Sequence, residues 1–211
     1  MNTTWVKSIF TRAKIDELLS RVNSSGLGTS APQFADNDAN NVTGSGWNSV
    51  NSTTANRPTG VTWGCIRTDC YYSAAMWQTY YQMGSTCRAV RSLTSGVWSD
   101  WAWDNPPMVL GTEYMLSERY TNKPIYTKLV NFGTLPAASN SKSVAFSTEN
   151  VTALSVDGRM SYNGDEYTMP FTLQNGATIS IYAHGKSVTI TSGASSLASY
   201  SAYVVVRYIK N

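Results

Sequence analysis

The first segment with a clear hydrophobic period lies near the N-terminus and predicts an amphipathic helix. Its apolar side chains recur at the spacing i, i+3, i+4, i+7 of one helix face: Ile15, Leu18, Leu19 and Val22. Thr11 is placed to cap the start, and Ser24-Ser25-Gly26 is placed to end the helix. A helix of about three turns is marginal alone in water. We therefore expect copies of it to pack together in an oligomer, the alternative being that it folds back on its own chain.

The next part of the chain changes to polar residues and then to short alternating runs. Residues 24–60 are rich in Ser, Asn, Gly and Thr and contain two prolines, which predicts a linker and irregular loop. Thr94-Ser95-Gly96 separates the last two of the runs that follow, as in a β-hairpin. The expected strands span residues 64–68, 74–82, 86–93 and 98–103.

A second series of alternating runs follows the break at Asn105-Pro106-Pro107, where we place a domain boundary. Asn163-Gly164 and His184-Gly185 lie between such runs and predict tight hairpins. The final run, residues 203–209, is apolar at nearly every position and is expected to be central and buried. Eight or so closely spaced strands indicate an antiparallel sandwich. They are expected at residues 125–132, 143–147, 151–156, 159–162, 166–169, 178–182, 187–190 and 202–209.

Charge and length exclude several classes of function. Only 14% of residues are charged, the net charge is +3, and Lys and Arg are dispersed, so we expect no nucleic-acid partner. No apolar stretch reaches the length of a membrane span, and the start lacks the pattern of a signal peptide, so we expect assembly in a cytoplasm and no membrane insertion. Cys65 and Cys70, five positions apart, would face opposite sides of a strand. With Cys87 they predict buried free thiols.

Aromatic residues concentrate between residues 47 and 103, which contain six of the seven tryptophans. Flat rings on a weakly charged surface suit a small β domain and also suit sugar binding. Alternation places Trp77 and Tyr81 on one face of their strand and Tyr80 on the other. By the same argument Trp98 and Trp101 would face opposite sides of a strand, and Trp101 and Trp103 would share one side.

The aromatic region resembles the knob-like domain of pyocin and bacteriophage tail fibres. That family has a Gly-Trp near its start, a strand with a central Gln, a strand that ends in Arg, and a Gly-x-Trp-x-x-Trp hairpin. The corresponding positions here are Gly46-Trp47, Gln78, Arg91 and the run Gly96-Val97-Trp98-Ser99-Asp100-Trp101. The resemblance implies that Trp98 and Trp101 are framework residues. The three cysteines are not part of the pattern.

The C-terminal half is similar to the terminal domain of many tail fibre and tail spike proteins. That resemblance depends on an ordered series of motifs and on the final Tyr-Val-Val-Val-Arg-Tyr strand. Where the family has a Trp before its Lys-Pro-Ile-Tyr run, this chain has Tyr120-Thr121-Asn122, which alters a surface turn. The series reads Glu113-Tyr114, Lys123-Pro124-Ile125-Tyr126, Phe132-Gly133-Thr134-Leu135-Pro136 and Lys142-Ser143-Val144.

Together, pattern and resemblance predict a mainly β protein in three parts. Residues 1–25 form a helix for attachment or trimerisation, residues 26–104 a small knob-like antiparallel β domain, and residues 105–211 a C-terminal antiparallel β-sandwich. The resemblance implies a homotrimeric appendage of a virion or phage-derived particle. It would join other tail or baseplate proteins through its N-terminus and adhere to a bacterial surface polysaccharide.

Receptor contacts in such proteins are expected in exposed loops. The tip candidates are Tyr162, Asn163, Asp165 and His184. The secondary candidates are the aromatic residues Trp77, Tyr81 and Trp103.

Catalysis has little support in the sequence. His184 is the single histidine, no Gly-x-Ser-x-Gly element is present, and no spacing suits a zinc site, so we expect no enzyme, cofactor or metal. A glycosidase needs only two carboxylates about 5–10 Å apart. Asp165 and Glu166 would point to opposite faces, which leaves Asp100 and Asp104 as the better pair. A structural baseplate or connector component and a glycan depolymerase remain the alternatives to an adhesin.

Overall fold

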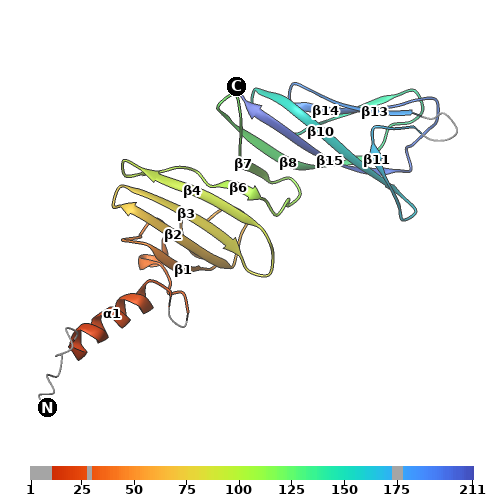
Figure 1. Cartoon of the computed structure of the whole chain (residues 1–211). Helices are drawn as coiled ribbons and strands as arrows, with labels where there is room; N and C mark the ends of the chain where they lie inside the picture. Colours follow the sequence, from red (N-terminus) through yellow and green to blue (C-terminus); the bar gives the residue numbers. More distant parts are fainter. Residues whose placement is uncertain (1–10, 28–29, 173–177) are drawn as a thin grey trace, which may run out of the picture. The chain divides into compact units, whose positions relative to one another are not determined.

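The computed structural model describes residues 11–27, 30–172 and 178–211 (Figure 1). The chain forms two compact units, which divide between Trp101 and Ala102. The sequence-based boundary lies three residues further on, so the strand that begins at Ala102 counts with the second unit. Each unit is described by itself.

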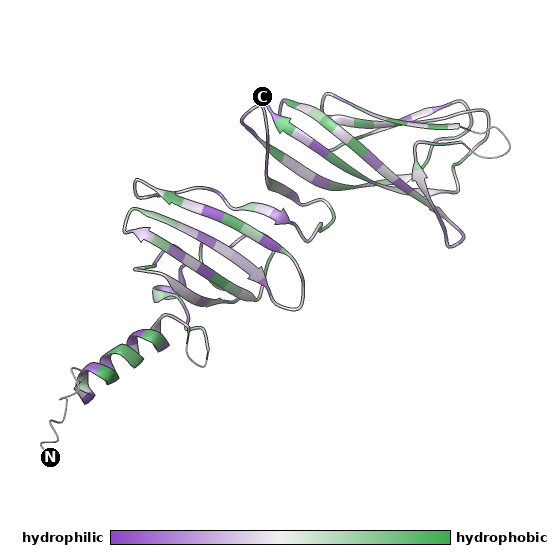
Figure 2. Cartoon of the chain, in the orientation of Figure 1, coloured by the Kyte–Doolittle hydropathy of each residue, from purple (hydrophilic) through white to green (hydrophobic). Residues whose placement is uncertain are grey.

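The N-terminal helix α1 (Arg12–Ser24) confirms the prediction at both of its ends. The Thr11 hydroxyl accepts a hydrogen bond from the Lys14 amide at 3.2 Å, as an N-cap does. Gly26 adopts a φ of 73° beyond the C-terminal end, where the Trp47 amide donates to the Ser25 carbonyl at 2.7 Å. The apolar stripe predicted for this helix is visible along it (Figure 2) and is exposed, from 38% at Leu18 to 56% at Leu19.

A four-stranded antiparallel sheet forms the body of the first unit, in the order β1-β2-β3-β4, and β5 pairs with β4. The β4–β5 hairpin turns at Ser95 and Gly96, whose φ angles of 53° and 80° suit the tight turn that the sequence predicted. The strands are β1 (Gly46–Val50), β2 (Gly64–Tyr72), β3 (Ala75–Gln82), β4 (Arg88–Thr94) and β5 (Val97–Trp98).

Two predictions for this unit were wrong. Residues 24–60 are not only a linker, because they contain β1 and a 3₁₀ turn (Ala35–Asn37), and Phe34 and Ala39 are buried in the unit's core. The strand expected at residues 98–103 is interrupted, since β5 ends at Trp98 and β6 begins at Ala102. Trp98, at the end of β5, and Trp101, just before β6, both contact one buried side chain.

The second unit is a sandwich of two sheets, as predicted. One sheet has the order β6-β7-β8-β15-β10-β11 and the other β12-β13-β14-β9; all pairs are antiparallel except β6–β7. The first sheet contains β6 (Ala102–Asn105), β7 (Glu113–Tyr120), β8 (Lys123–Thr134), β10 (Val151–Tyr162), β11 (Asp165–Met169) and β15 (Ser201–Lys210). The second contains β9 (Ser141–Ala145), β12 (Phe171–Thr172), β13 (Thr178–His184) and β14 (Ser187–Ser192).

The sandwich differs from the sequence prediction in the shape of β10 and β15. β10 is one continuous strand that runs through Gly158. A Cβ at position 158 would come within 2.4 Å of the Met169 methyl and 2.9 Å of Ile181, so the strand needs a glycine there. β15 is central, between β8 and β10, as expected. It is buried on one face only: Val204 is 0% exposed, whereas Tyr203 is 46% exposed. β7 was missed by the sequence analysis.

Candidate functional site

The inner face of the first sheet contains a buried arginine cage. Arg91, Gln78 and Thr68 lie opposite one another across β4, β3 and β2. The Nε of Arg91 donates to the Gln78 amide oxygen at 2.8 Å, and both side chains donate to the Ala39 carbonyl, at 3.0 and 2.8 Å. Gln78 also donates to the Thr68 hydroxyl at 3.3 Å. The two long polar side chains are therefore satisfied although Arg91 is only 6% exposed.

Two tryptophans complete the cage. The guanidinium carbon of Arg91 lies 4.3 Å from the Trp98 ring centroid and 4.5 Å from that of Trp101, within cation–π range. The Trp101 indole donates to the Asn56 carbonyl at 2.8 Å. Desolvation lowers the pKa of Arg91 to about 10, and the charge of Asp38 opposes that shift, so the guanidinium remains charged at neutral pH.

The cage explains what the sequence motif does. Four of the residues that carry the resemblance to knob domains, Gln78, Arg91, Trp98 and Trp101, meet around one guanidinium, in agreement with the expected framework role of the two tryptophans. The prediction that these two rings face opposite sides of a strand was wrong. Because the strand ends at Trp98, the alternation rule does not extend to Trp101.

The outer face of the same sheet exposes aromatic rings. Trp77 is 54% exposed and Tyr81 is 36% exposed, on the same side of β3, whereas Tyr80 on the other side is fully buried. This confirms the predicted alternation. Trp47 of β1 joins them, with its ring centroid 5.5 Å from that of Tyr81. We call Trp47, Trp77 and Tyr81, with the residues of β2 between them, the aromatic face.

An ion pair crosses the aromatic face on β2. Both the Nε and an Nη of Arg67 donate to Oδ1 of Asp69, at 3.0 and 2.7 Å. Arg67 lies opposite Trp47, and Asp69 lies opposite Trp77. The two charged side chains are about half exposed, at 49% and 48%, so the pair presents charged hydrogen-bonding groups between two flat rings. Sequence analysis missed this pairing because it did not recognise β1, whose register brings Trp47 to Arg67.

Three of the predicted loop candidates lie together at one end of the sandwich. The β10–β11 hairpin turns at Asn163 and Gly164, with φ angles of 50° and 91°. Tyr162 and Asp165 pair across its base. Tyr162 is 38% exposed, and its ring stacks on Tyr200 with centroids 4.6 Å apart. The hairpin is therefore an exposed tip with an ordered aromatic pair, and its role in binding stays a prediction.

His184 does not join this tip, contrary to the grouping expected from the sequence. It ends β13 opposite Ser187, and Gly185 rather than His184 takes the positive φ of the turn. The neighbouring carbonyl of Lys186 accepts from the Phe146 amide. Phe146 packs on Tyr208, near the end of β15, whereas the Tyr162 tip lies at the beginning of that strand. Seven residues of β15, about 23 Å of strand, separate the two ends.

Trp103 is unsuitable as a receptor contact, which corrects that secondary candidate. It is 2% exposed, and its ring packs edge-on against Tyr114 at 5.5 Å. The parallel pairing of β6 with β7 brings Trp103 opposite Leu116, which is also buried, so the ring is not available at the surface. Exposed aromatic candidates therefore remain at Trp77 and Tyr81.

The cysteines and acidic residues form no further chemical site in the described part of the chain. Cys65, Cys70 and Cys87 are free, as predicted, but half-buried rather than fully buried. Burial raises the pKa of Cys65, which disfavours its reactive thiolate. Among residues 11–27, 30–172 and 178–211, no group of three or more His, Cys, Asp or Glu could hold a metal ion. None of the helices in these ranges is long and apolar enough to cross a membrane.

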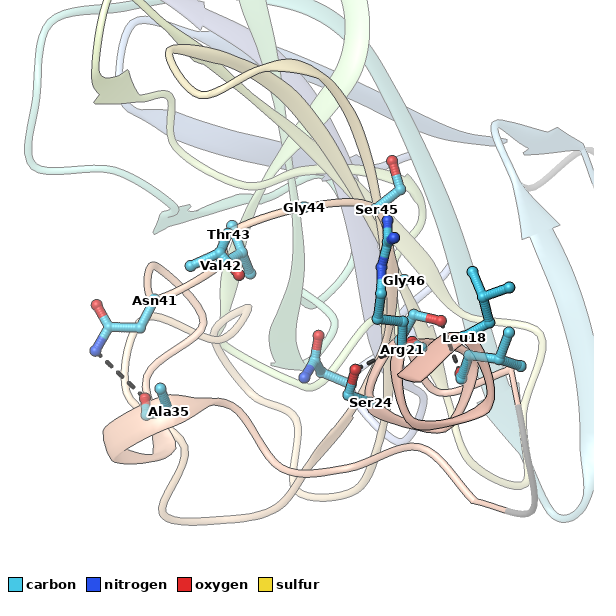
Figure 3. A pocket seen from close by; sticks show the side chains of 13 residues that line it. Leu18, Arg21, Ser24, Ala35, Asn41, Val42, Thr43, Gly44, Ser45 and Gly46 are labelled. Carbon is cyan, nitrogen blue, oxygen red and sulfur yellow. Dashed lines mark hydrogen bonds between the residues drawn. The ribbon is translucent and has the colours of Figure 1, made fainter. Parts of the chain in front are cut away.

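A groove lies beside helix α1 within the first unit. Leu18, Arg21 and Val22 line one side of it, and the loop from Asn41 to Gly46 lines the other (Figure 3). The groove has a volume of about 630 Å³. The Asn41 side chain donates to the Ala35 carbonyl at 3.3 Å, which ties the loop to the 3₁₀ turn. Two residues of the exposed apolar stripe, Leu18 and Val22, thus face a loop that is mostly polar.

Comparison with known proteins gives one set of similar structures. No protein-family model and no curated protein matches the chain. The P. aeruginosa R1 pyocin fibre, solved over its C-terminal residues, aligns with 90% of this chain and 70% of its own, at 15% identity and a TM-score of 0.32. An N-truncated R2-type pyocin tail fibre aligns with 83% of this chain and 95% of its own, at 13% identity and a TM-score of 0.29.

The P. aeruginosa R2 pyocin fibre gives a similar result, over 85% of this chain and 68% of its own, at 12% identity and a TM-score of 0.29. Superposition at this level is loose.

Proposed function

We propose that the chain is an adhesin of the tail-fibre type, a homotrimer that binds a glycan on a bacterial surface. It would belong to a virion or a phage-derived particle and join other tail or baseplate proteins through its N-terminal part. The observation that carries the proposal is the aromatic face, where the exposed rings of Trp77 and Tyr81 and the half-buried ring of Trp47 surround the Arg67–Asp69 pair. The motif series of both halves of the chain supports the same assignment.

The aromatic face has the chemistry that sugars require. The apolar C–H face of a pyranose ring stacks on Trp and Tyr, and its hydroxyl groups bond to fixed polar groups such as a carboxylate and a guanidinium. Large rings that are more than one-third exposed cost apolar hydration in the free protein, and a bound sugar would relieve part of that cost.

Trimerisation would make weak contacts effective. Single sugar contacts are weak, and three linked copies convert later contacts into intramolecular ones. Helix α1 supports this part of the proposal, because its 13 residues expose the whole apolar stripe and are too few for a stable isolated helix. Replacing Leu18 and Leu19 by Ser should therefore release monomers in sedimentation experiments. A wild-type chain that is monomeric at micromolar concentration would contradict the trimer.

Binding of the purified chain to bacterial envelope polysaccharide tests the function. The double variant Trp77→Ala, Tyr81→Ala should lose most of that binding and keep its fold. Tyr182→Ala is the matched control, because Tyr182 is 49% exposed on β13 of the other unit, and its loss should leave binding unchanged. If the wild type binds no envelope extract and does not block adsorption of its particle, the proposal is wrong and a connector role replaces it. New reducing ends in the polysaccharide would instead reveal a depolymerase.

A further inference from the structure

The edge of the aromatic face between β1 and β2 contains a small cavity with an unusual lining. Its volume is about 250 Å³, which is of the order of one sugar ring and smaller than a typical drug-sized pocket. It is open to solvent on the side of the sheet where the ion pair lies. The lining residues are Leu27, Ser45, Gly46, Trp47, Arg67, Thr68 and Asp69.

The lining combines one aromatic side chain with polar groups whose positions are fixed. Trp47 is fixed on two sides, since its amide donates to the Ser25 carbonyl and its ring lies beside Tyr81. Ser45 is fixed by the Cys70 amide, which donates to its hydroxyl oxygen at 2.9 Å. A site whose groups are already ordered loses less conformational entropy when a ligand binds.

The geometry of the ion pair leaves hydrogen-bonding capacity for a ligand. Both hydrogen bonds from Arg67 end on Oδ1 of Asp69, so Oδ2 of the carboxylate and the second Nη of the guanidinium take no part in the pair. One side chain can thus accept from a hydroxyl while its neighbour donates to the adjacent hydroxyl. Two adjacent hydroxyl groups on a pyranose ring offer this combination.

We propose that this cavity is the subsite for one neutral hexopyranose unit of the glycan, an assignment that rests on the proposed function. Trp47 stacks on the C–H face of the ring, Asp69 accepts from one hydroxyl, and Arg67 donates to the next. The Ser45 hydroxyl, which accepts from the Cys70 amide, donates its proton to a third sugar oxygen. The ring is neutral because the charges of Arg67 and Asp69 cancel at the cavity.

The cavity also restricts which sugars fit. Gly46 lies at its base, where an added Cβ would come within 2.5 Å of the Ser25 carbonyl oxygen, so the backbone there is closely packed and has no room to widen. One sugar ring stacked on Trp47 fills such a space, and the rest of the glycan then extends across the sheet. Trp77 and Tyr81 lie along that path, since Asp69 and Trp77 are opposite each other on β2 and β3.

Methyl glycosides of glucose, galactose and mannose are the probes, added to the full chain and followed by saturation-transfer NMR and tryptophan fluorescence. At least one should bind, and Asp69→Asn should weaken it about tenfold, as expected for loss of one charge-assisted hydrogen bond. Trp47→Ala should abolish binding. Tyr182→Ala is the control, because Tyr182 is exposed on β13 of the other unit and its loss should leave the monosaccharide affinity unchanged.

The outcomes separate the subsite from the function. If the three glycosides fail to bind, or Asp69→Asn binds them as the wild type does, the subsite is wrong. Polysaccharide binding that still depends on Trp77 and Tyr81 would then leave the proposed function intact. Tighter binding of methyl glucuronoside than of every neutral glycoside would overturn the neutral assignment, because the matched charges of Arg67 and Asp69 give a carboxylate no advantage. If the wild-type protein binds no polysaccharide, the proposed function is wrong, and so is the subsite that rests on it.

Discussion

The two faces of the first sheet use the same residue types for opposite purposes. On the inner face an arginine lies against two tryptophans and is 6% exposed, with its donors bound to Gln78 and Ala39. On the outer face an arginine lies among Trp and Tyr rings with its side chain 49% exposed, paired with Asp69 on its own strand. The comparison teaches that burial, rather than composition, separates the framework from the surface proposed to bind a glycan.

The two faces should differ most in how much the free energy of unfolding falls when their arginine is replaced by alanine. Arg91→Ala should lower the free energy of unfolding by about 3 kcal/mol or more, because the buried Gln78 amide oxygen loses its donor, the Ala39 carbonyl loses one of its two donors, and space opens between two indole rings. Arg67→Ala should cost at most about 1 kcal/mol, as exposed ion pairs do. Urea unfolding of both variants measures the contrast, and equal midpoints would show that the cage does not stabilise the unit.

Arg91→Lys sharpens the same comparison. Lysine keeps the charge but loses the planar fork that contacts Gln78 and Ala39 together, so it should be less stable than the wild type and more stable than Arg91→Ala. If the Lys variant were as stable as the wild type, the positive charge alone would be enough to stabilise the cage, and the bidentate geometry would not be needed.

The edge of the sheet offers a second contrast, between a closely packed and an open glycine. A Cβ on Gly64 would come within 2.3 Å of the Tyr81 carbonyl oxygen and 2.6 Å of the Tyr80 ring, so Gly64→Ala should destabilise by about 1–3 kcal/mol. Gly44→Ala meets nothing within 4 Å and should change stability by about 0.5 kcal/mol or less. Thermal unfolding of the two variants decides this, and an unchanged Gly64→Ala would contradict the close approach of β2 and β3.

Adjacent tyrosines on β3 provide a pH-dependent version of the comparison. Tyr80 is fully buried and donates to the Trp63 carbonyl at 2.8 Å, so Tyr80→Phe should cost about 1 kcal/mol at neutral pH. Desolvation first, and the nearby Cys65 and Cys87 next, raise the pKa of Tyr80 from 10.0 to about 12. Because the folded protein holds this proton more tightly than the unfolded chain, the contribution is complete below pH 10 and is lost as pH rises through about 12.

The measurement compares the urea midpoint of wild type, Tyr80→Phe and Tyr81→Phe at neutral pH and at pH values between these two limits. The loss of stability with rising pH should be smaller in Tyr80→Phe than in the wild type, and Tyr81→Phe should behave as the wild type does. If the loss of stability with rising pH is identical in all three proteins, groups other than Tyr80 cause it.

Several elements of the fold could be predicted from local sequence pattern, and the predictions that failed have a common cause. Helix α1 and the hairpins at Ser95-Gly96 and Asn163-Gly164 depend on residues near in sequence, so caps and turn residues were sufficient. β1 was missed because its five residues acquire their role only by pairing with β2. Gly158 was read as a break because the need for a small residue comes from Met169 and Ile181 across the fold.

The candidate site shows the same limit. Alternation along β3 correctly separated Trp77 and Tyr81 from Tyr80, since all three lie on one continuous strand. It failed for Trp98 and Trp101, where the strand ends, and for Trp103, whose burial depends on Tyr114 of β7. The Arg67–Asp69 pair beside Trp47 required the register of β1, which no local pattern supplies.

The smallest expected effect completes the comparison of the two faces. Trp77→Ala should change the free energy of unfolding by about 0.5 kcal/mol or less, because the ring is 54% exposed and removing it leaves no closed cavity. Trp98→Ala, which removes a ring 4.3 Å from the buried guanidinium, should cost several times more. If Trp77→Ala proved as destabilising as Trp98→Ala, the outer ring would be part of the framework, and the selective loss of polysaccharide binding expected for Trp77 could no longer be assigned to a binding surface.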